Sequence, residues 1–95
     1  MQTYIILSKI SPDALKEPDD FKKMAGEVGE KIKKECPQVT WKDSYAVKGA
    51  YDVVDIIESN DSGEVDKASM IIRSLGRSDT VTMMATPWKE FLHLL

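Results

Sequence analysis

The chain has few of the residues that build covalent or metal-bound sites: its 95 residues include one cysteine, Cys36, and one histidine, His93. A single cysteine excludes an intramolecular disulfide and a cluster of thiolate ligands from one chain. A zinc ligand needs partners, and the only acidic residue near His93 at a suitable spacing is Glu90. We therefore expect no metal site and a reducing compartment, the cytoplasm, with Cys36 as a packed or half-exposed thiol at a helix end.

Long apolar runs are also missing. No segment approaches the roughly 20 apolar residues that a membrane span needs, and the first residues, MQTYIILSKI, lack the charged region that opens a secretory signal. There is no glycine-rich dinucleotide motif, P-loop, HExxH or nucleophile elbow. These absences predict a protein without a membrane partner, and they argue against the common classes of cofactor enzyme.

Positive charge is scarce as well: 13 Lys and Arg stand against 16 Asp and Glu, for a net charge of -3. The only dense basic run is Lys31 to Lys34, so nucleic acid is not an expected partner. A composition of 42% hydrophobic and 31% charged residues is typical of one globular domain, residues 1–95. A chain this short buries a modest core, which favours self-association.

The hydrophobic pattern predicts six main elements in the order βαββαβ. Short segments rich in β-branched residues indicate strands, and apolar residues at helical spacing indicate helices. The expected strands are 3–10, 38–49, 51–59 and 79–86, the expected helices are 18–36 and 60–76, and 87–95 is expected to form a short helix or tail.

The second strand alternates apolar and polar residues, which predicts that Trp41, Asp43 and Tyr45 share one side. Gly49 and Ala50 are expected to make a tight reversal into the third strand. There, Asp55 lies on the same side as Tyr51 and Ile57, and both sides of the strand are substantially apolar.

This order indicates an α+β fold, the ferredoxin-like βαββαβ plait. Its four antiparallel strands, in spatial order 4-1-3-2, have both helices on one face. A sheet whose second face met water would alternate more cleanly. We therefore expect a homodimer in which the sheet of a second subunit covers that face and closes a dimeric α/β barrel.

The sequence resembles the GYD domain family, through Gly49, Tyr51 and Asp52 and through the segments TYIILSKIS, GAYDVVDIIESND and TPWKEF. The likeness covers nearly the whole chain. It implies a homodimer of ferredoxin-like protomers related to the dimeric α/β-barrel proteins, and it implies no particular reaction. Asp55 departs from the family pattern, which usually has an apolar or small residue there.

The motif residues have an architectural interpretation and a functional one. Gly49 suits a turn that needs positive φ, Tyr51 brings a large ring and a hydroxyl, and Asp52 can accept backbone N–H groups near the turn. Tyr51 is also a candidate ligand-binding residue. Trp41 and Tyr45 are further candidates, since both can line a cavity, although aromatic residues on one strand often belong to a core.

Asp55 is the candidate catalytic residue, because a carboxylate among apolar side chains is a candidate acid or base. The alternative is that it bonds to a hydroxyl and lines a polar pocket; the hydroxyls considered are Ser8, Ser44, Tyr45 and Thr82. Two functions remain open. One is a homodimer that binds a small apolar or amphipathic ligand or a protein partner. The other is a cofactor-independent enzyme, oxygenase-like or isomerase-like, with Asp55, Tyr45 and Trp41 in one cavity.

Overall fold

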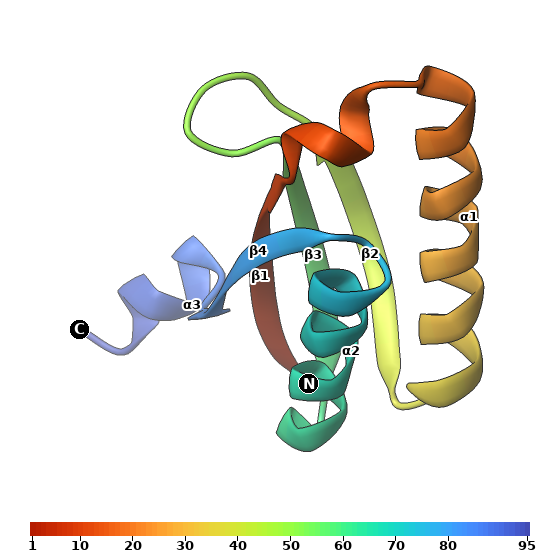
Figure 1. Ribbon diagram of the computed structural model, residues 1–95. Helices are drawn as coiled ribbons and strands as arrows, with labels where there is room; N and C mark the ends of the chain where they lie inside the picture. The colour runs from red at the N-terminus through yellow and green to blue at the C-terminus, as the bar shows by residue number, and fades with distance from the viewer.

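The computed structural model describes all 95 residues. Four antiparallel strands form one sheet in the order β2-β3-β1-β4, and the two long helices lie on the same side of it (Figure 1). This is the ferredoxin-like arrangement that the sequence predicts. The elements are β1 (Gln2–Ile10), the 3-10 helix η1 (Pro12–Leu15), α1 (Pro18–Glu35), β2 (Val39–Ala46), β3 (Val53–Ser59), α2 (Ser62–Ser74), β4 (Ser78–Ala85) and α3 (Trp88–His93).

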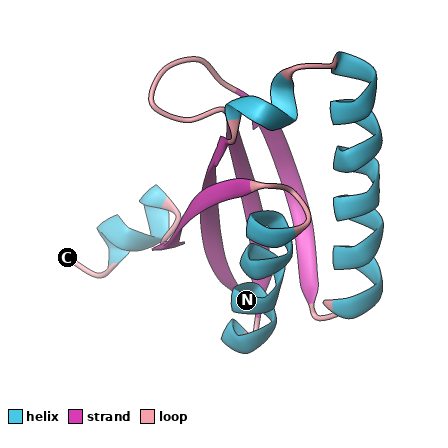
Figure 2. Cartoon of the chain, viewed as in Figure 1, coloured by secondary structure: helices cyan, strands magenta, loops and turns pink.

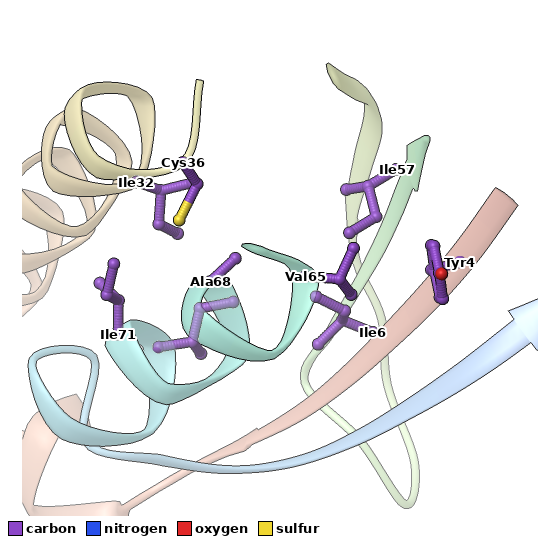
Figure 3. Packing of buried hydrophobic residues seen from close by; sticks show 9 residues of the cluster. Tyr4, Ile6, Ile32, Cys36, Ile57, Val65, Ala68 and Ile71 are labelled. Atoms are coloured by element: carbon purple, nitrogen blue, oxygen red, sulfur yellow. The ribbon is translucent and has the colours of Figure 1, made fainter. Parts of the chain in front are cut away.

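Helix α2 begins directly after Asp61, whose side chain accepts a hydrogen bond from the backbone N–H of Glu64 at 3.1 Å. Such a cap satisfies one of the unpaired donors of a helix N-terminus. Residues of α2 spaced three or four apart then lie on the sheet, so that Val65, Ala68 and Ile72 are buried. Figure 3 shows Val65 beside Ile6 of β1.

The core is small and lies mainly between α2 and the two central strands. Nine buried residues form it, and Ile6 and Ile57 have no exposed surface. Helix α1 contributes only Ile32, followed by Cys36 just beyond its end (Figure 3). Only 15 of the 95 residues are buried, so that much apolar surface remains for another molecule to cover.

The connection between β2 and β3 is longer than the predicted reversal at Gly49 and Ala50. Residues 47–52 form a loop, drawn as a wide arc in Figure 2, which is closed by the backbone N–H of Val47 donating to the Asp52 carbonyl at 2.9 Å. Gly49 has a φ of 122° in this loop, a conformation that side chains with a Cβ rarely adopt. The glycine of the motif therefore has an architectural role.

Asp52 also holds the sheet together. Its Oδ2 accepts a hydrogen bond from the backbone N–H of Ile10 at 2.8 Å, and its Oδ1 lies 3.7 Å from the Lys9 ammonium. The backbone N–H of Asp52 donates to the Ser8 carbonyl at 2.9 Å. The aspartate thus joins the start of β3 to the end of β1, whereas the sequence suggested donors within the turn.

Candidate functional site

A cavity of about 550 Å³ lies between α1 and the side of the sheet that faces the helices. Ten of its 17 lining residues are hydrophobic. Phe21, Met24 and Val28 line it from α1 and are only half-buried, because that part of the helix does not close on the sheet. Val39 and Val53 line it from the strands. Its size and apolar walls are those of a small-molecule site.

Asp55 lies in this cavity with 7% of its surface exposed. Its Oδ1 accepts hydrogen bonds from the hydroxyl of Ser44 at 2.6 Å and from the indole N–H of Trp41 at 3.1 Å. The same indole N–H lies 2.9 Å from Ser44 Oγ, to which it also donates. Of the four hydroxyls considered for Asp55, Ser44 is therefore the one that binds it, and no protein group donates to Oδ2.

A β-bulge brings these three side chains together. Trp41 is paired with Ile57, but the next pair along β2 is Asp43 with Ile56, so that one extra residue is inserted in β2. An extra residue reverses the sides on which the following residues lie. Ser44 thereby comes opposite Asp55, on the cavity side.

The bulge also corrects the predicted grouping on β2. Trp41 faces the cavity, but Asp43 and Tyr45 lie on the opposite side of the sheet, where Tyr45 is paired with Val54 and is 54% exposed. The expectation that Trp41, Asp43 and Tyr45 share one side is wrong, because it assumed strict alternation. The trio that the enzyme hypothesis requires is not assembled in the cavity.

Tyr51 does not reach the cavity either. It belongs to the loop that precedes β3, is half-buried, and is not among the residues that line the cavity. Of the three predicted ligand-binding residues, only Trp41 lies beside the predicted catalytic residue Asp55. No sequence signal singles out Phe21, Met24 and Val28 as a cavity wall, because their spacing is also that of a packed helix.

Ser8 is the second unusual polar residue of the cavity. It is 3% exposed, and its hydroxyl oxygen is the one fully buried side-chain polar atom without a hydrogen-bond partner. On β1 it is paired with Val53, while Ile6 is paired with Asp55. Ser8 and Asp55 are therefore diagonal neighbours on one face of the sheet, roughly 7–8 Å apart at Cα.

The remaining candidate residues lie elsewhere. His93 is exposed on α3, and no three side chains of the types that bind metals gather anywhere in the chain. Cys36 is 1% exposed, hence a packed thiol. Burial, followed by the negative charge of Glu64, raises the pKa of this thiol, which favours its neutral form.

The second face of the sheet carries no helix, and we call it the open face. Its residues include Val81, Met83 and Tyr45, which are 43%, 41% and 54% exposed. The strand pairing places further apolar side chains on the same face, namely Ile5, Leu7, Val54 and Ile56. Such a continuous apolar surface usually marks an interaction site.

Helix α3 follows β4 and projects away from the rest of the chain (Figure 1). Three of its six residues are large and apolar, and these residues, Trp88, Phe91 and Leu92, are 71%, 41% and 48% exposed. The rings of Trp88 and Phe91 stack with centroids 5.7 Å apart. This helix therefore adds to the apolar surface that a partner can cover. None of the helices is both long and apolar enough to span a membrane.

Comparison with known proteins adds three findings. The model of a family described as "GYD domain" matches residues 4–95. A protein of Thermus thermophilus named "glutamine synthetase and cystathionine beta-lyase binding protein" is 32% identical over 97% of this chain and 96% of its own length. A crystal structure from the same organism is 27% identical, with a TM-score of 0.56 over 92% of this chain and 95% of the other.

Proteins of lower sequence identity share the same fold. The leucine response regulatory protein of Mycobacterium tuberculosis superposes with a TM-score of 0.61 over 90% of this chain at 14% identity. The match spans 51% of that longer protein. At this identity the likeness concerns the fold alone.

Proposed function

The chain belongs to the GYD domain family, and from this premise we propose that it is a homodimeric binding protein that takes a small apolar or amphipathic ligand in the cavity under α1. The main support for this proposal is the cavity, which has a volume of about 550 Å³ and contains the buried carboxylate of Asp55. We further propose that the protein works in the cytoplasm, where its single buried thiol stays reduced.

The half-buried wall of α1 supports a ligand in this place. An 18-residue helix that buries only Ile32 leaves Phe21, Met24 and Val28 partly in contact with water. Full burial of a side chain of this kind contributes about 1.5–3 kcal/mol. A ligand with an apolar body would cover these side chains and gain part of that free energy.

The exposed apolar residues of the open face support the proposed dimer. Its apolar residues run across β1, β3 and β4, and Met83 and Val81 are more than two-fifths exposed. A second copy offers the same apolar surface, and a two-fold axis brings two identical patches together. A protein partner on this face is the second candidate, favoured by the Thermus thermophilus relative, whose name describes it as a binding protein of glutamine synthetase and cystathionine beta-lyase.

Two glycines of α1 provide the test of the ligand site. Gly29 lines the cavity and Gly26 does not, and a Cβ at either position meets no atom within 4 Å. Leucine at either position is expected to stabilise the helix by up to about 1 kcal/mol relative to glycine. Only Gly29→Leu places a side chain in the cavity.

The probe is 1-octanol, titrated into ¹⁵N-labelled protein and followed by NMR. We expect saturable shifts at residues that line the cavity, such as Val28 and Val53, in the native protein and in Gly26→Leu. In Gly29→Leu the affinity should fall at least about tenfold, since the added side chain occupies the space. Equal affinity of both variants, or no saturable binding to the native protein, would refute the proposed site.

A further inference from the structure

No cationic side chain of the protein is paired with Asp55. The five ion pairs of the chain include neither Asp55 nor Lys33, the one basic residue that lines the cavity. Both groups that donate to Asp55, Ser44 and Trp41, are neutral. Buried carboxylates are ordinarily paired with a cation or bound by several donors. A ligand that brings positive charge would supply what this site lacks.

The vacant hydrogen-bonding positions are specific. Asp55 Oδ1 already accepts two hydrogen bonds, while Oδ2 accepts none from the protein. The hydroxyl of Ser8, on the same face of the sheet, is buried without a partner. One group with several N–H donors, placed between them, would bond to both oxygens at once, whereas an alcohol has a single hydrogen to donate.

The walls of the cavity indicate the chemistry of the rest of the ligand, beyond its charged group. The surfaces around these polar groups are apolar, contributed by Phe21, Met24 and Val28 on α1 and by Val39 and Val53 on the sheet. A hydrophilic cation such as a free polyamine would leave these walls uncovered. An aliphatic or aromatic body attached to the charged group would cover them.

We propose that the cavity selects an organic amine: an apolar body of moderate size that ends in a protonated amino group, held between Asp55 Oδ2 and the Ser8 hydroxyl. This inference rests on the proposed function, and it adds the chemical class of the ligand. An ammonium group adds the attraction of a full positive charge to the carboxylate and offers three N–H donors where an alcohol offers one O–H, so that the amine is distinguished from a neutral molecule of the same shape.

Three probes with the same eight-carbon chain separate the alternatives: n-octylamine, 1-octanol and octanoate, each titrated at pH 7. The readout is the indole N–H signal of Trp41, because this group donates to Asp55. The indole of Trp88, 71% exposed on α3, reports binding outside the cavity. We expect octylamine to shift the Trp41 signal saturably and to bind at least about tenfold more tightly than 1-octanol.

Asp55→Asn keeps the shape of the side chain and removes its charge. It should lower the affinity for octylamine at least about tenfold and leave that for 1-octanol within about threefold of the native value. The matched control is Asp43→Asn, the same change on the open face of the same sheet, which should alter neither affinity. Ser8→Ala should weaken octylamine binding roughly three- to tenfold, a second test if Asp55→Asn does not fold.

The outcomes separate the two proposals. If none of the probes shifts the Trp41 signal saturably, the cavity is not a ligand site and the proposed function fails. If 1-octanol binds as tightly as octylamine, the cavity binds ligands but the preference for an amine is wrong. Tightest binding of octanoate would also overturn this preference, and it would assign the decisive charge to Lys33.

Discussion

Met83→Glu is expected to convert the protein from a dimer of about 21 kDa, twice the mass of one chain, into a monomer of 10.7 kDa. Met83 lies on the open face, opposite Ile5 of β1, and is 41% exposed. Under a two-fold axis the substitution introduces two carboxylates into one apolar interface. Each costs several kcal/mol to bury without a partner. Sedimentation velocity at micromolar concentration measures the mass.

Met84→Glu is the matched control, because Met84 is the next residue of the same strand and lies on the other face. It is opposite Tyr4 and is 72% exposed. The charge added there meets water, so this variant should remain a dimer. A native protein that sediments as a monomer, or a Met83→Glu variant that sediments as the native dimer, would contradict the assigned interface.

Ile57→Ala should remove about 2–5 kcal/mol from the free energy of unfolding. Ile57 has no exposed surface and belongs to the nine-residue core on the helix side of the sheet. Truncating it leaves a cavity among residues that cannot close around it. Because domains are typically stable by only 5–15 kcal/mol, this is a large share of the total. Urea unfolding at several protein concentrations measures the loss.

Ile56→Ala, one residue earlier, provides the comparison. Ile56 is half-buried and faces the open side, opposite Ile5. The substitution should lower the free energy of unfolding of each protomer by less than Ile57→Ala does. Its effect should depend on protein concentration, because it weakens the association of the two protomers. A loss as large as that of Ile57→Ala at every concentration would show that the open face is not an interface.

The element order and the sheet order follow from the sequence because its periodic signals are long and clear. The apolar residues of α2 recur at helical spacing, and the alternation of sides along β3 correctly predicts that Asp55 and Ile57 share one face. The order βαββαβ then leaves few ways to pair the strands. These features depend on local patterns and short connections.

The composition of the site depends on features that local patterns do not report. The bulge between Trp41 and Asp43 occurs in a segment with no glycine to signal it, and it moves Tyr45 away from Trp41. The loop of residues 47–52 likewise takes Tyr51 out of the sheet. The cavity itself exists because α1 packs on the core only near Ile32, a tertiary property that helical spacing does not reveal.

Asp55 shows both what the sequence can predict and what it cannot. Its burial could be predicted from the apolar residues around it in β3. Its partners could not, because Ser44 and Trp41 reach it only through the shifted register of β2. The predicted residues Asp55 and Trp41 lie together, while the hydroxyl of Ser8 acquires its significance only from the structure.

Whether the space under α1 is a preformed ligand site can be decided by a crystal structure of the unliganded protein. We expect an open cavity of about 550 Å³, with Phe21 and Met24 separated from the sheet and Asp55 bound to Ser44 and Trp41. A structure in which α1 lies flat on the sheet, with Phe21 and Met24 packed against Trp41 and no space left beside Asp55, would contradict it.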